Sequence, residues 1–126
     1  MSANILIVDD SKPVRDVIRK LLEIQTGLTV CGEAEDGIEA IRKAEILTPD
    51  LVLLDLVMPK LNGAATAREL RRISPKVPII LSTMFGQAAE ALAPAVGVDV
   101  VLSKPDGLHN LVVRIRELIL SPAAQE

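Results

Sequence analysis

The feature of this sequence that most restricts its fold is a regular alternation of short apolar runs with longer amphipathic segments. Four runs are rich in Val, Ile and Leu and lie at residues 5–8, 51–54, 77–81 and 98–102. Runs of this length are typical of strands buried on both faces of a parallel sheet. A fifth run, residues 28–34, alternates apolar with polar or small residues. We therefore expect it at an edge of the sheet.

Helical patterns lie between these runs. The first begins after Ser11, a candidate N-cap, with Pro13 in its first turn. A segment at residues 87–96 is rich in Ala, and its Pro94 should shorten or bend a helix there. Four of the expected helices are marked by apolar residues at helical spacing: Val14, Val17, Ile18, Leu21 and Leu22 in the first, then Ile38, Ile41 and Ala44, then Ala67, Leu70 and Ile73, and finally Leu108, Leu111, Val112, Ile115, Leu118 and Ile119.

The alternation of strands and helices predicts an α/β fold of the (βα)5 type. Such a chain forms a parallel sheet with right-handed crossovers and helices on both faces. The common strand order for a doubly wound sheet of this size is 2-1-3-4-5. We expect a single domain over residues 1–126, with a core at about residues 4–120 and a polar tail at 121–126.

Composition and charge exclude several classes of function. The net charge is −3 and no Lys/Arg cluster is present, so neither nucleic acid nor an anionic membrane is an expected partner. Phe85 is the sole aromatic residue, which argues against base stacking. There is no signal-peptide pattern and no apolar run near the roughly 20 residues that span a bilayer. With the lone Cys31, these features favour the cytoplasm.

Polar side chains follow the predicted strands at the points where those strands end. Asp9 and Asp10 follow the first strand, Asp55 the third and Ser82 the fourth, while Lys104 comes two residues after the fifth. In a sheet of order 2-1-3-4-5, ligands bind at the carboxyl ends of the strands, between strands 1 and 3. We therefore expect these five side chains to share one crevice.

Three carboxylates in one crevice repel each other, and a divalent cation would relieve that repulsion. Mg²⁺ prefers oxygen ligands and often binds one or two carboxylates together with a phosphate oxygen. A carboxylate can also attack phosphorus and form an aspartyl phosphate. Each residue alone has an ordinary explanation as a helix cap or turn residue, but their conjunction favours a site. His109 is expected on the surface, and Glu33, Glu35 and Asp36 at a solvated edge and a helix start.

The motifs resemble those of response-regulator receiver domains of two-component signalling, and the resemblance extends over residues 5–119. They are the run ending in Asp9-Asp10, the stretch from Asp50 through Asp55 to Met58-Pro59 with Gly63, then Ser82, and finally Lys104-Pro105. The resemblance implies a flavodoxin-like fold. It also implies a role for each site residue: Asp55 as phosphoacceptor; Asp10, Asp55 and the Val57 carbonyl as ligands of Mg²⁺ or Mn²⁺; Asp9 as an assisting ligand through water; Lys104 as partner of the phosphoryl group; and Ser82 as the switch hydroxyl.

The family also implies partners and a mode of action. The phosphoryl donor would be a histidine kinase, a phosphotransfer protein or a small phosphodonor. Phosphorylation would change the surface of the fourth helix, fifth strand and fifth helix, which would act on an output domain or effector. The same surface would support a monomer or a weak homodimer. The domain would not be an enzyme beyond catalysing its own phosphorylation and dephosphorylation.

The sequence departs from the family at three positions near the expected output surface. Val101 stands where an aromatic switch residue is usual, Thr83 where a small residue is usual, and Pro94 lies in the fourth helix. These departures leave open a phosphorylation-independent scaffold, or an atypical receiver with altered switching. A small phosphatase is a third hypothesis, but such enzymes usually carry a second Asp two residues after the nucleophile, where this chain has Val57.

Overall fold

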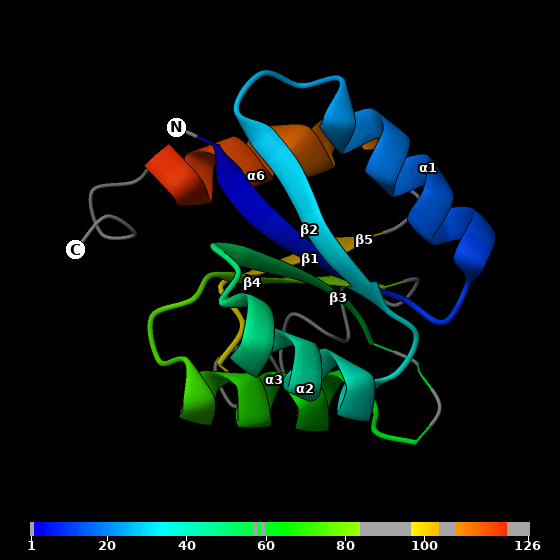
Figure 1. Ribbon diagram of the computed structural model, residues 1–126, viewed down its shortest axis with the longest axis vertical. Helices are drawn as coiled ribbons and strands as arrows, with labels where there is room; N and C mark the ends of the chain where they lie inside the picture. The colour runs from blue at the N-terminus through cyan, green and yellow to red at the C-terminus, as the bar shows by residue number, and fades with distance from the viewer. Residues whose placement is uncertain (1, 57, 59, 84–96, 104–107, 121–126) are drawn as a thin grey trace.

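A five-stranded parallel sheet lies between two layers of helices (Figure 1). The computed structural model describes residues 2–56, 58, 60–83, 97–103 and 108–120. The strands are β1 (Ala3–Val8), β2 (Leu28–Ala34), β3 (Leu51–Asp55), β4 (Ile79–Thr83) and β5 (Val100–Ser103). The helices in the described part of the chain are α1 (Lys12–Glu23), α2 (Gly37–Leu47), α3 (Gly63–Ile73) and α6 (Leu108–Leu120). The segment 87–96, with Pro94, lies outside the described residues.

The strand order is β2-β1-β3-β4-β5 and every pairing is parallel, which confirms the predicted topology and the edge position of residues 28–34. Strand β4 begins at Ile79, two residues later than predicted. The cause is local: the N–H of Val77 donates to the carbonyl of Ser74 in a turn, and Pro78 has no N–H to contribute.

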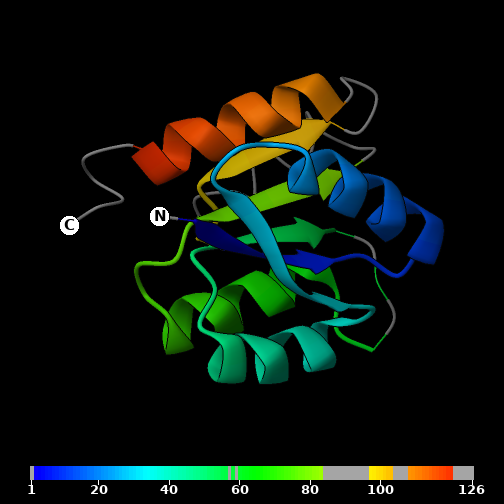
Figure 2. The same ribbon diagram turned by 45° about the horizontal axis from the view of Figure 1, so that its top comes forward.

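Alternate residues of each central strand face opposite helical layers, as strand geometry requires. Ile5 and Ile7 pack with Leu22 of α1 and with Leu111 and Ile115 of α6. Leu6 and Val8 of β1 point to the opposite face, where they pack in one cluster with Ala40 and Ala44 of α2 and with Ala67 and Leu70 of α3. Figure 2 shows α1 and α6 on one face of the sheet and α2 and α3 on the other.

Side-chain caps fix where the helices begin. Ser11 accepts from the N–H of Val14 at the start of α1, and Pro13 lies in the first turn, as predicted. Asp36 caps α2 by accepting from the N–H of Glu39, which confirms its interpretation as a helix start. Asn62 caps α3 in the same way. Each cap satisfies a backbone donor that the helix itself leaves unpaired.

The apolar stripe predicted for α1 is incomplete. Leu22 is fully buried, but 51% of Val17 is exposed. Val17 instead lines an open pocket between α1 and the sheet. None of the described helices has both the length and the apolar character that a membrane span needs.

Candidate functional site

The ends of β1 and β3 place the acidic residues of the site. Val8 of β1 is the register partner of Leu54 in β3, so the residues that follow each of them, Asp9 and Asp55, lie side by side. Asp55 is the last residue of β3 itself, one position earlier relative to the strand end than the sequence suggested. The rigid sheet therefore positions Asp55.

Ser82 adjoins Asp55 on the other side. The two are register partners in the β3–β4 pair. Strand β4 extends to Thr83, so Ser82 lies within the strand rather than just past its end. Ser82 and Asp55 both line one pocket, together with Asp9. The structure thus brings together four of the expected site residues: Asp9, Asp10, Asp55 and Ser82.

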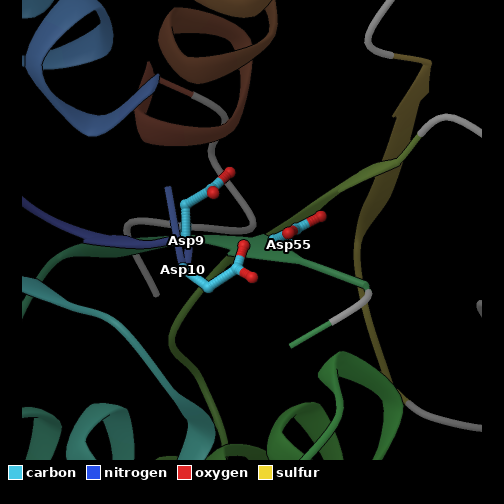
Figure 3. Close-up of side chains that lie close together, drawn as sticks. All are labelled: Asp9, Asp10 and Asp55. Carbon is cyan, nitrogen blue, oxygen red and sulfur yellow. The ribbon is translucent and has the colours of Figure 1, made fainter. Parts of the chain in front are cut away.

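Three carboxylates converge at the carboxyl edge of β1 and β3 (Figure 3). One carboxylate oxygen from each of Asp9, Asp10 and Asp55 lies within 4.8 Å of the others. Two oxygens bound to one Mg²⁺ at about 2.1 Å are separated by roughly 3–4 Å. Small side-chain rotations close that difference. The donor set is all oxygen, so the residues present fit a hard divalent cation.

The burial of these carboxylates differs. Asp9 and Asp55 are only 4% and 6% exposed, whereas Asp10 faces solvent. A pocket of about 390 Å³ reaches Asp9, Asp55 and Ser82 from the side of α1, and its walls are mainly apolar. Apolar walls strengthen electrostatic interactions inside the pocket because they lower the local dielectric constant. A cation and an anionic phosphoryl group would both interact strongly with charges placed there.

Asp9 is held by its backbone and its side chain. Its N–H donates to the carbonyl of Ala34 at the end of β2, over 3.0 Å. One carboxylate oxygen, Oδ1, accepts from the N–H of Ser11 at 2.9 Å. Its carbonyl accepts from Nη1 of Arg15 at 2.6 Å. The loop between β1 and α1 is therefore fixed on three sides.

Two of the predicted site features, the Val57 carbonyl and Lys104, lie outside the described residues. Val101 is described: it is half-buried, pairs with Leu81 in the β4–β5 register and packs against the core on the α2 and α3 side. It supplies aliphatic packing where the family usually has a ring.

The sequence interpretation missed an ion-pair network beside the site. Glu33, expected at a solvated edge, accepts from Nε of Arg15 at 2.9 Å and from Nε of Arg19 at 2.6 Å. Although partial burial raises it, the hydrogen bonds from Arg19 and Arg15 hold the pKa of the Glu33 carboxyl below its usual value. Arg15 and Arg19 are one helical turn apart on α1, next to the edge strand that carries Glu33. The spacing of these two arginines by one helical turn was the sequence feature that could have indicated the network.

A second missed contact ties the loop after β3 to α2. Nζ of Lys60 lies 3.4 Å from Oδ2 of Asp36, the capping residue of α2. Hydrogen bonding from the N–H of Glu39, together with Lys60, lowers the pKa of the Asp36 carboxyl. The backbone of Lys60 has φ of 68°, an unusual left-handed conformation for a residue with a side chain. Nothing in the sequence distinguished this lysine from a solvated one.

The comparisons agree with this fold. The family model for the response regulator receiver domain matches residues 5–116. The chain belongs to this family of two-component signalling domains. Receiver domains typically bind Mg²⁺ at an acidic pocket, and this chain has a cluster of three Asp residues at the edge described above.

Several relatives are similar over most of the chain. Response regulator MprA of Mycobacterium ulcerans is 38% identical over 120 residues, which are 94% of this chain and 51% of that protein. A protein-glutamate methylesterase/protein-glutamine glutaminase of Pyrococcus abyssi is 35% identical over 114 residues, 90% of this chain and 31% of that protein. A crystal structure of a LuxR-family two-component response regulator from Aurantimonas sp. SI85-9A1 has a TM-score of 0.89 at 33% identity, covering 100% of this chain and 95% of that one.

The chain spans about half or less of the length of these curated relatives. The match to the methylesterase covers about a third of that enzyme. What the whole relatives do therefore does not transfer to this chain as a finding. The shared part is the receiver domain, generally a signalling domain.

Proposed function

We propose that this domain is a phosphorylation-controlled switch in which Asp55 accepts a phosphoryl group. The donor is a histidine kinase, a phosphotransfer protein or a small phosphodonor. Mg²⁺, or Mn²⁺ in its place, is held by Asp10, Asp55 and the Val57 carbonyl, with Asp9 assisting through water. The observation that carries the proposal is the convergence of three carboxylates within 4.8 Å, in a chain of the receiver family.

The chemistry is a phosphoryl transfer between a donor and a carboxylate. An Asp55 carboxylate oxygen attacks phosphorus, and the bond from phosphorus to the donor nitrogen or oxygen breaks with its electron pair leaving on the donor. The product is an acyl phosphate, which water later hydrolyses. When bound, Mg²⁺ neutralises charge on the phosphoryl oxygens, the main catalytic requirement of such transfers.

Residues of the chain supply position and hydrogen bonds. Asp55 is held at the end of a buried strand, so its carboxylate is presented in a fixed place. The hydroxyl of Ser82, its register neighbour, donates a hydrogen bond to a phosphoryl oxygen and so senses phosphorylation. We assign Lys104 to the same phosphoryl group as a counter-charge.

The test is incubation with acetyl phosphate and Mg²⁺, followed by intact mass spectrometry. Wild type should gain the mass of one phosphoryl group, and the gain should disappear when Mg²⁺ is chelated. The Asp55→Asn variant keeps the shape of the side chain but is a much poorer nucleophile, so it should gain nothing. A phosphoryl group that persists on Asp55→Asn, or one that never appears on wild type, would reject the proposal.

A scaffold that works without phosphorylation is the second candidate. The observation that favours it is Val101, which has no ring to rotate and is already half-buried against the core. Under this alternative a partner protein would bind wild type and Asp55→Ala equally well. Under the switching proposal, phosphorylation would change partner affinity in wild type alone.

The wider setting follows the family. We propose residues 1–126 as one receiver unit working in the cytoplasm, either alone or joined to an output domain. Its effector, or a weak homodimer, would use the surface of segment 87–96, β5 and α6. The net charge of −3 supports an output without direct nucleic-acid contact by this domain.

A further inference from the structure

Arg15 connects the acidic site to the edge of the sheet, and the chemistry proposed above gives it no role. Its Nη1 donates to the Asp9 carbonyl at 2.6 Å, and its Nε donates to Oε1 of Glu33 at 2.9 Å. The Arg15 side chain is 12% exposed, so solvent screens these bonds weakly. A guanidinium is rigid and planar, so engaging both donors at once fixes its orientation.

The carbonyl that Arg15 holds belongs to the peptide bond between Asp9 and Asp10. Because a peptide unit is planar, fixing its oxygen also fixes the direction in which the chain leaves toward the Cα of Asp10. The N–H of Asp9 is held independently by the carbonyl of Ala34. With both ends of this residue held, the backbone presents the Asp10 side chain toward Asp55 (Figure 3).

Glu33 keeps Arg15 in place for this task. It binds Nε of Arg15 and also Nε of Arg19, which lies one turn later on α1. Arg19 has a further acidic partner in Glu23, at 2.8 Å from its Nη1. Without Glu33, the guanidinium of Arg15 would be free to turn toward the three carboxylates and compete with a cation. Glu33 therefore holds the positive charge of Arg15 beside the site and keeps it directed at the Asp9 carbonyl.

We propose that Arg15, anchored by Glu33, is a positioning residue that orients the Asp9–Asp10 peptide so that the Asp10 carboxylate reaches the cation site beside Asp55. The proposal rests on the proposed function, because it assumes that a divalent cation binds there. Arg15 touches neither the cation nor the phosphoryl group, so its effect runs through the backbone. Partners of this kind, one step removed from a metal, typically change metal affinity by about 10–100-fold when mutated.

Arg19 provides a matched control. Arg15→Gln and Arg19→Gln each remove one positive charge and one ion pair to Glu33 from the same helix. Among the described residues, the Asp9 carbonyl receives its hydrogen bond from Arg15 and not from Arg19. Electrostatics alone predicts that losing a nearby positive charge tightens Mg²⁺ binding. Weaker binding would therefore isolate the loss of positioning.

The experiment is isothermal titration of Mg²⁺ into wild type and both variants, with the thermal midpoint of each measured separately in chelator. The Mg²⁺ Kd should rise about tenfold or more in Arg15→Gln and stay within about twofold in Arg19→Gln, where electrostatics is screened near the surface. Arg15→Lys keeps the charge but cannot hold both partners in the same geometry, so it should give an intermediate Kd.

Two results would overturn the proposal: an unchanged or lower Kd in Arg15→Gln, or equal weakening in Arg15→Gln and Arg19→Gln. If Arg15→Gln does not fold, Glu33→Gln replaces it in the same titration. It should raise the Kd clearly more than Glu23→Gln, which removes the same negative charge from this network without touching Arg15, and an equal or smaller rise would refute the anchoring. Failure of the proposed function is distinguishable: wild type itself would then bind no Mg²⁺, or would bind it equally well after Asp10→Asn.

Discussion

Substitution of Gly63 by Ala should damage both the stability of the fold and the acidic site. Gly63 is the first residue of α3 and lies against the end of β3. A Cβ atom built there would be 2.3 Å from the carbonyl oxygen of Asp55 and 2.6 Å from the Cα of Leu56. Close contacts between carbon and oxygen are normally about 3.3 Å or longer. The backbone must therefore separate by about 1 Å.

The size of the effect follows from what blocks the new methyl group. The obstacles are backbone atoms of Asp55 and Leu56, which cannot rotate away. Overpacking of this kind costs about 1–3 kcal/mol, and at most about 1 kcal/mol returns from the better helix propensity of Ala. A net loss of about 1–2 kcal/mol should lower Tm by roughly 4–8 °C in a chain of this size.

Gly32→Ala is the matched control. The Cβ at Gly32 would meet Cδ1 of Leu47 at 2.7 Å, and that atom is the mobile end of a side chain. Gly in a strand interior is itself unfavourable by about 0.5–1 kcal/mol, so the change should be neutral or slightly stabilising. Differential scanning calorimetry with and without Mg²⁺ measures both effects. The Mg²⁺-induced rise in Tm should shrink in Gly63→Ala and persist in Gly32→Ala.

A Gly63→Ala variant that melted at or above the Tm of wild type would refute the expected loss of stability. If Gly63→Ala were destabilised but its Tm rose with Mg²⁺ as much as that of wild type, only the expected damage to the acidic site would be refuted. In that case α3 would have moved away and left Asp55 in place.

Further predictions concern the carboxylates and the hydroxyl of the site. Mg²⁺ at about 100 times its Kd should stabilise wild type by about 2.7 kcal/mol. Asp10→Asn should lose most of that gain, yet it should melt at a higher temperature than wild type in chelator, because one repelling charge is gone. Thermal scans with Mg²⁺ and with chelator test both expectations. Asp36→Ala removes the cap of α2 and should cost about 1 kcal/mol in urea unfolding. The pKa of the Asp36 carboxyl is lowered in the fold, so its ionised form stabilises the protein at pH values above the unfolded pKa of about 3.9. The stability advantage of wild type over Asp36→Asn should therefore fade as the pH drops below that value. An advantage that stays constant between about pH 3 and about pH 7 would contradict this expectation. Ser82→Ala should keep its Mg²⁺ affinity but accept phosphate from acetyl phosphate about tenfold more slowly, as expected for losing one hydrogen bond to a charged group; stopped-flow measurement at saturating Mg²⁺ tests this.

Much of the fold could be predicted because local and global signals agree. The existence of the five strands, the cap Ser11 and the helix start at Asp36 followed from residue patterns, and the strand order was expected as the common one for a doubly wound sheet of this size; the structure confirms these. The strand bounds were less exact, because β4 and β5 each begin two residues later than predicted. The convergence of Asp9, Asp10 and Asp55 was predictable because parallel strands end at one edge. The end of β4 was harder to predict, because whether Ser82 follows the strand or lies within it depends on the pairing of β4 with β5.

What could not be predicted depends on contacts between elements that are far apart in sequence. Glu33 looked solvated because alternation along a strand does not reveal which helix covers it. Its pairing with Arg15 needs the position of α1 relative to β2. Val17 fitted an apolar stripe but is half exposed, since the stripe does not show how closely α1 approaches the sheet. The clash at Gly63 likewise depends on the path of the loop between β3 and α3.

The central claim is that the ends of β1 and β3 form one cation site beside a reactive carboxylate. A crystal of the protein grown with Mn²⁺ in place of Mg²⁺ tests it most directly, because Mn²⁺ gives an anomalous signal. We expect one strong peak bonded to carboxylate oxygens of Asp10 and Asp55, at about 2.2 Å, close to the distance for Mg²⁺. A peak bound elsewhere, with those two carboxylates turned apart, would contradict the account.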